Sequence, residues 1–373
     1  MPLEWAVVFG VSLFIKISYV AYAGIGLSID TPRYWAMARA SPAVTPGSPS
    51  FHYLGYPLIL SFFMKILPPH WVGWAAIWTQ VALGAVSCVF LYHAILLLTS
   101  QKRIGLIFAL YYCASFEVLY WDHYILTDSF NLSLMVASGA WMIAFFTAKD
   151  SPSWPALSGV ALLSIYLFFT RPTDIVFILI NGIFILYYFI RRLSFKMKLG
   201  TLLVSAVVFC ALTIGFYQRV QLTDHIRGMI LSRIEAGQVI EDDAATKIPL
   251  TFAWESASSS KKIAFAGKLL AKRLAYFWAI FPGRYSSAHK IYNALWLLPL
   301  WVAGLGSLLY ALWRKRDRVT IYLIAIILGY NVFHALTLID FDFRFRIVTI
   351  PFLLMLIASC YADLRVRRSR VPA

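Results

Sequence analysis

Long runs of apolar residues alternate with short polar connections along the chain. Ten runs have the length and apolar character of helices that cross a bilayer, for which about 20 residues are needed. The expected spans cover 4–25, 73–98, 104–121, 129–147, 155–170, 174–190, 199–217, 293–313, 319–338 and 347–363. Unbroken runs of this kind do not suit an outer-membrane barrel, whose strands alternate at about every second residue. The pattern predicts an all-α, polytopic membrane helix bundle of about 10 transmembrane helices, in a single domain over residues 1–373.

Two longer connections carry helical patterns of their own. In residues 27–72, an amphipathic pattern at 31–40 and an apolar one at 56–67 flank a hinge rich in Pro, Ser and Gly. In residues 218–291, lysine and arginine alternate with apolar residues over 261–281. Amphipathic helices of this kind lie in the plane of a membrane interface, so we predict interfacial helices in both connections.

Composition indicates that lipid is the main solvent of the protein. The apolar set makes up 61% of the residues and the charged set 13%. Soluble domains have roughly half and a quarter, respectively, so a soluble or disordered chain is excluded. The four cysteines lie in apolar runs without Cys/His ligand spacing, which predicts no zinc or iron–sulfur site.

The net charge of +16 comes largely from basic residues in the connections between the predicted spans, and it does not indicate a nucleic-acid partner. Lysine and arginine concentrate in one set of short connections, such as 191–198, 314–318 and 365–370. By the positive-inside rule these connections are cytoplasmic. Both termini should then be cytoplasmic, and 27–72 and 218–291 extracytoplasmic. The compact chain fits a bacterial inner membrane.

Ionisable residues that the spans do not require gather at the predicted outer ends of the helices. Charge at membrane depth is costly and usually marks a site or a water-filled cavity. We therefore predict a polar cavity that opens away from the cytoplasm. Its candidate residues are Asp30, Asp122, His123, Asp128, Arg171, Asp174, Asp340, Asp342, Arg344 and Arg346.

Structural roles are open for each of these residues. Asp30, Asp128 and Asp174 stand where helix N-caps are expected. The charges at 340–346 could form local ion pairs, and Arg171 could snorkel to the interface. His334 suits a core position. Lys16 lies in the middle of the first span, where it should face the bundle.

Several short motifs follow one another along the chain at the predicted outer face. They are Asp30-Thr31-Pro32-Arg33-Tyr34, Gly55-Tyr56-Pro57-Leu58, Leu126-Thr127-Asp128-Ser129, Thr170-Arg171-Pro172, and His334 followed by Phe343-Arg344-Phe345-Arg346. In this order the chain resembles the multi-pass, C-type glycosyltransferases that use polyprenyl-phosphate sugars. That superfamily includes protein O-mannosyltransferases and the aminoarabinose transferases that act on lipid A.

The resemblance implies an inverting glycosyltransferase that moves a sugar from a polyprenyl-phosphate donor to an extracytoplasmic lipid, glycan or protein acceptor. Asp30 would be the general base. The donor phosphate would be bound by Arg171, Arg344, Arg346 and Arg284, and the cavity would be lined by Tyr34, His52, Tyr56, Asp122, His123, Asp128 and Asp342. No metal ligand is assigned, and the use of a divalent metal stays open.

A transporter or flippase of a lipid-linked saccharide is the alternative. Its outer cations would bind the headgroup phosphate without chemistry. Such a protein should carry functional charges at both faces or along a path, whereas here they concentrate on one side.

Overall fold

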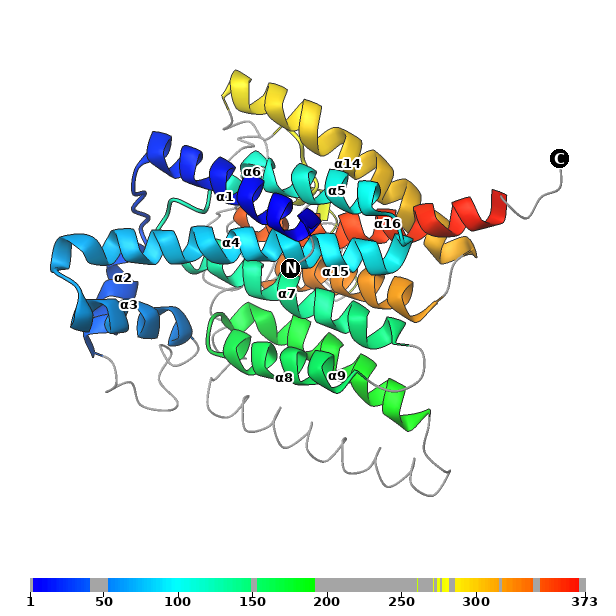
Figure 1. Cartoon of the computed structure of the whole chain (residues 1–373), viewed down its shortest axis with the longest axis horizontal. Helices are drawn as coiled ribbons and strands as arrows, with labels where there is room; N and C mark the ends of the chain where they lie inside the picture. The colour runs from blue at the N-terminus through cyan, green and yellow to red at the C-terminus, as the bar shows by residue number, and fades with distance from the viewer. Residues whose placement is uncertain are drawn as a thin grey trace.

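The computed structural model is a bundle of α-helices that run roughly along a common direction (Figure 1). It describes residues 3–40, 53–148, 153–191, 286–314, 317–337 and 343–368, with scattered positions between 260 and 281. Within these ranges the chain forms helices and one isolated β-bridge, between Gly26 and Tyr124. The prediction of an all-α fold is confirmed for this part of the chain.

Within the described ranges, six helices are long and apolar enough to cross a membrane. They are α1 (Leu3–Ala23), α4 (Pro69–Thr99), α7 (Thr127–Thr147), α14 (Ser287–Arg314), α15 (Arg318–Thr337) and α16 (Thr349–Arg368). Each coincides with a predicted span, and together they indicate an integral-membrane protein, since a helix satisfies its own backbone in lipid.

The total of about ten spans stays a prediction. Helices α8 (Trp154–Phe168) and α9 (Ile175–Ile190) match two predicted runs, but both are shorter than a usual span. The predicted span at 199–217 lies outside the described residues, as does most of the amphipathic pattern at 261–281.

The predicted span at 104–121 is wrong as a single helix. Helix α5 (Lys102–Cys113) ends early, and α6 (Phe116–Leu119) follows after a break. The Tyr292 hydroxyl of α14 donates to the Ala114 carbonyl at 3.0 Å and accepts from the amide of Phe116. One side chain therefore satisfies backbone groups that the break exposes, as burial in a membrane protein demands.

Helices α2 (Thr31–Ala40) and α3 (Gly55–Ile66) lie where short helices were predicted in the first long connection. They pack beside the N-terminal part of α4, whose 31 residues extend about 46 Å. Figure 1 shows this extension with α2 and α3 at its side. Leu58, Phe62 and Ile66 form an exposed apolar stripe on α3. The placement of these helices at a membrane surface stays a prediction.

Four connections meet at one end of the bundle, which we call the loop end: residues 24–31, 53–56, 120–128 and 169–174. The amide of Gly26 donates to the His123 carbonyl at 2.7 Å, and the amide of Gly55 donates to the Phe169 carbonyl at 2.7 Å. A Cβ on Gly26 would stand 2.7 Å from the Tyr124 ring, so glycine permits this close approach. Connections that are distant in sequence thus form one layer.

The core is centred on α4, α7 and α16. Phe352 of α16 is fully buried, and its ring lies 5.7 Å from that of Phe177 in α9. It also packs against Gly139 of α7, where an added Cβ would approach the Phe352 ring to 2.6 Å. The glycine therefore sets how closely α7 and α16 can pack.

We expect Gly139→Ala to destabilise the bundle by about 1–3 kcal/mol, because the added methyl group overfills a closely packed contact. Gly306→Ala on α14 is the matched control, since nothing lies within 4 Å of its added Cβ. Thermal unfolding of both variants in detergent measures the difference. Equal stability of the two variants would contradict this packing.

Candidate functional site

Three of the predicted site residues lie on the connection from α6 to α7 and at the start of α7. Asp122, His123 and Asp128 are buried, with exposed fractions of 0%, 7% and 2%. Buried charges need partners, and Asp122 finds its partner in Lys16 of α1, whereas Asp128 finds its partner in Arg171 of the connection after α8. The segment 122–128 therefore collects polar groups from several parts of the bundle.

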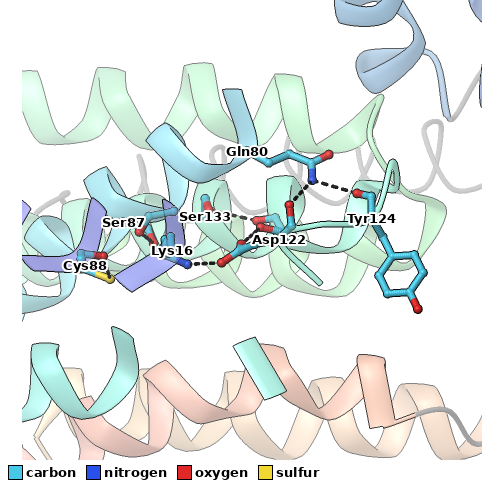
Figure 2. A network of polar contacts seen from close by, with 10 residues as sticks. Lys16, Gln80, Ser87, Cys88, Asp122, Tyr124 and Ser133 are labelled. Atoms are coloured by element: carbon cyan, nitrogen blue, oxygen red, sulfur yellow. Dashed lines mark hydrogen bonds and ion pairs between the residues drawn. The ribbon is translucent and has the colours of Figure 1, made fainter. Parts of the chain in front are cut away.

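Asp122 forms a buried ion pair with Lys16, the lysine in the middle of α1 (Figure 2). Lys16 Nζ lies 2.5 Å from Asp122 Oδ2, and Ser129 donates to Asp122 Oδ1. Gly84 of α4 makes room for the lysine, because an added Cβ would stand 2.8 Å from Nζ. The prediction that Lys16 faces the bundle is confirmed. The Asp122 carboxylate is occupied by this pair, which favours a structural role over a substrate contact.

Gln80 of α4 connects the same segment to α3. Its amide nitrogen donates to the backbone carbonyls of Asp122 at 3.3 Å and Tyr124 at 2.9 Å (Figure 2). Its amide oxygen accepts from the Tyr56 hydroxyl. Tyr56 is 1% exposed and its ring lies 5.6 Å from that of Tyr34. Tyr56 therefore supports the loop end by packing.

Arg171 lies at the centre of a second buried group, the Arg171 cluster, which comprises Asp128, Asn131, Arg171 and Asp174. Arg171 Nη2 is 2.9 Å from Asp128 Oδ1, and the two side chains are 11% and 1% exposed. Asn131 donates to Asp174 Oδ1 at 3.0 Å. Predicted outer-face charges from two connections are thus brought together by the fold.

The electrostatics of the Arg171 cluster differ between its charged residues. Burial opposes the charge of Arg171, but the Asp128 carboxylate raises the pKa of Arg171 overall. Burial raises the pKa of Asp174 to about 7, although Arg171 and the bond from Asn131 work in the opposite direction. Asp174 can therefore gain or lose a proton near neutral pH.

Tyr34 of α2 connects the Arg171 cluster to the segment that carries Asp30. The Tyr34 hydroxyl shares a 3.2 Å hydrogen bond with Thr127, and Tyr34 interacts electrostatically with Arg171 and Asp128. The amide of Tyr34 donates to the Asp30 carbonyl at 3.3 Å, so Asp30 is one helical turn, about 6 Å, before it. Asp30 itself is half-buried. The structure thus brings Asp30 and Arg171 to the same end of the bundle.

A cleft of about 690 Å³ opens beside α2. Its walls come from the start of α2 and from the corner between α3 and α4, and Arg39 is its charged residue. The lining is Leu27, Ser28, Thr31, Pro32, Trp35, Ala36, Arg39, Met64, Pro69 and Val72. Ligand pockets are commonly about 300–1,000 Å³ and mostly apolar. Because Ser28 and Thr31 flank Asp30 in the chain, this cleft lies beside the predicted base.

Arg346 pairs with Glu117, a residue that the sequence analysis did not single out. Arg346 Nε donates to Glu117 Oε2 at 2.9 Å, Nη2 binds Oε1, and Nη1 donates to the Ala279 carbonyl. Both side chains are buried. This arrangement favours a structural role for Arg346 over phosphate binding. A lone acid in an apolar run was the available signal for Glu117.

The remaining predicted residues fall into two groups. The His123 ring packs among aromatic rings, 5.5 Å from Tyr19 and 4.2 Å from Tyr124. His52, Arg284 and Asp342 lie outside the described residues, and of Arg344 only the backbone position in η4 (Phe343–Val348) is described. No three His, Cys, Asp or Glu side chains gather as metal ligands within the described ranges.

No family model matches the chain, and no curated protein matches its sequence. The resemblance to polyprenyl-phosphate-sugar transferases therefore stays a prediction that rests on the short motifs, of which those around Asp30, Gly55, Asp128 and Arg171 lie at the loop end.

We expect Lys16→Met and Asp122→Asn each to destabilise the protein by about 3–5 kcal/mol, because each leaves a buried charge without its partner. The double variant should lose much less than the sum of the two. Thermal unfolding of the four proteins in detergent gives the coupling energy.

The exposed pair of Glu4 and Lys102 is the control for this cycle. Its coupling should be close to zero, since solvent screens exposed ion pairs. If the losses of stability in Lys16→Met and Asp122→Asn added up in the double variant, the two side chains would not form the ion pair described.

Proposed function

We propose that the protein is an integral-membrane glycosyltransferase that moves a sugar from a polyprenyl-phosphate donor to an acceptor. The observation that carries this proposal is the convergence of Asp30, Tyr34 and the Arg171–Asp128 pair at the loop end. A carboxylate, a guanidinium and an apolar cleft at one end of the bundle would provide a base, a phosphate ligand and room for a lipid chain.

Arg171 would bind the donor phosphate. The leaving group of this reaction is a phosphate that departs as an anion, so it needs a cation and no acid. A guanidinium can make two parallel hydrogen bonds to phosphate oxygens, which orients the donor as well as neutralising it. Arg171 is buried enough for this interaction to be strong and is still 11% exposed.

Asp30 would remove the proton from the acceptor. The acceptor oxygen or nitrogen attacks the anomeric carbon while its proton passes to the Asp30 carboxylate. The bond from the anomeric carbon to the phosphate oxygen breaks, and its electron pair leaves with the lipid phosphate. Attack opposite to the leaving group inverts the anomeric centre.

The cleft beside α2 would hold the apolar part of a lipid substrate. Trp35, Met64, Pro69 and Val72 offer apolar surface, and Arg39 offers a charge for a headgroup. The exposed apolar stripe of α3 would place the cleft at the membrane surface. A lipid could then enter from the bilayer without crossing water.

The loop end would face away from the cytoplasm. Basic residues such as Lys102, Arg318 and Arg367 belong to the opposite ends of their helices, which supports this orientation under the positive-inside rule. We place the protein in a bacterial inner membrane, with both termini cytoplasmic.

The distribution of ion pairs favours a transferase over a flippase. Among the described residues, the buried pairs are those of Lys16, Arg171 and Arg346; Asp122, Asp128 and Arg171 belong to the loop end, and Glu117 directly precedes it in the chain. The pairs at the opposite end, Glu4–Lys102 and Asp363–Arg367, are exposed. A path for a charged headgroup would need buried charge along the whole bundle.

We expect Asp30→Asn to lower sugar transfer by about 10²–10⁴-fold, because the acceptor loses its base. Arg171→Gln should lower transfer by about 10²–10³-fold through loss of charge stabilisation. The assay uses purified protein in liposomes with radiolabelled polyprenyl-phosphate sugars and candidate acceptors.

Asp363→Asn, at the opposite end of the bundle, is the control and should keep full activity. Undiminished transfer by Asp30→Asn would remove Asp30 as the base. Labelled lipid that crosses the bilayer without transfer would establish the flippase instead.

A further inference from the structure

The Arg171 cluster contains two buried carboxyl groups and one guanidinium. Asp128 and Asp174 are 2% and 0% exposed, and both interact with Arg171. If both carboxylates are ionised, one negative charge in this group has no counter-charge. An unbalanced charge in a buried site is expensive, and a carboxyl group can avoid the cost by holding a proton.

The hydrogen bonds indicate which carboxyl holds that proton. Asp128 Oδ1 is in direct ionic contact with Arg171 Nη2, 2.9 Å away. Asp174 receives a hydrogen bond from the neutral amide of Asn131 on Oδ1, whereas its Oδ2 has no hydrogen-bond partner among the described residues. Asp174 is therefore the carboxyl that is easier to neutralise.

The groups that face Asp174 come from several elements. Arg171 precedes it in the same connection, and the amide of Asp174 donates to the Arg171 carbonyl at 3.2 Å. Asp128 and Asn131 lie on α7, and Tyr330 of α15 also interacts with it. Tyr34 and His334 lie within electrostatic reach of Arg171. Within this set Arg171 is the only permanent cation.

Resting on the function proposed above, we propose that Asp174 is a positioning residue that binds a proton when Arg171 binds the donor phosphate. A phosphodiester brings one further negative charge to a group that already contains Asp128. When Asp174 is neutral, the Arg171 guanidinium can interact with both the Asp128 carboxylate and the phosphate. An ionised Asp174 competes for the guanidinium and repels the phosphate. Phosphate binding and proton uptake at Asp174 are then linked.

The linkage has a definite sign. Below about pH 7 Asp174 already holds its proton, so the affinity for phosphate is high and constant. Above that pH the proton must be taken from solution, and affinity falls by about tenfold for each pH unit. Asp174→Asn imitates the protonated carboxyl in size and charge, so it keeps the affinity high at all of these pH values.

The test measures binding without transfer, which leaves the role of Asp30 aside. The probe is a polyprenyl methyl phosphate, a phosphodiester whose single charge is constant between about pH 5.5 and pH 8.5. Its dissociation constant is measured over that range for the wild type, Asp174→Asn and Asp174→Glu in detergent. We expect the dissociation constant of the wild type and of Asp174→Glu to rise with pH, and that of Asp174→Asn to stay constant. Infrared spectroscopy should show a protonated carboxyl that Asp174→Asn lacks.

The outcomes separate this proposal from the function on which it rests. Asp363→Asn, far from the cluster, should titrate like the wild type. Binding with the same slope in Asp174→Asn, or with no slope in the wild type, would overturn the role of Asp174 and leave the transferase standing. A slope that disappears with Asp128→Asn but persists in Asp174→Asn would move the proton to Asp128. No binding by the wild type at any pH would overturn both the phosphate site and the linkage.

Discussion

Lipid offers no hydrogen bonds, so the polar groups of this bundle must satisfy one another, and several that join different helices meet at residues 122–128. The Asp122 carboxylate neutralises Lys16 of α1, and two backbone carbonyls of this segment accept from Gln80 of α4. Thr31 of α2 donates to the Ile125 carbonyl at 3.2 Å. Three helices are thereby fixed to one connection, and a change in this connection would disturb all of them.

The candidate site is built on the same segment. Thr127 and Asp128, which begin α7, are the residues that meet Tyr34 and Arg171. The position of Arg171 relative to Asp30 is therefore set by the interactions that hold the bundle together. This sharing has a practical consequence. Removing a charge here can reduce activity by altering the fold, so an effect on chemistry has to be separated from stability by isosteric changes and by binding measurements.

The sequence predicted the helices better than the side-chain contacts between them. Apolar runs give spans because burial in lipid demands them, and the placement of Asp30, Asp128 and Arg171 at one common end of the bundle followed from counting those spans. The pairing of Glu117 with Arg346 joins residues 229 positions apart, and no local pattern encodes it. The break after α5 depends in the same way on the Tyr292 hydroxyl, 178 positions from Ala114. Both are consequences of packing, which a single sequence does not reveal.

Arg171 and Arg346, the two proposed phosphate-binding arginines whose side chains are described, differ in how they could accommodate a phosphate. Arg346 donates through Nε and both terminal nitrogens, to a carboxylate and to a carbonyl, and it is 3% exposed. A phosphate would have to displace a two-point ion pair there and leave Glu117 buried without a partner, which is strongly unfavourable. Arg171 contacts Asp128 through Nη2 and keeps 11% of its side chain exposed, and a second carboxyl beside it can accept a proton. An incoming anion can therefore be accommodated at Arg171 through a change of protonation, whereas at Arg346 it would break an interaction that joins α6 to η4.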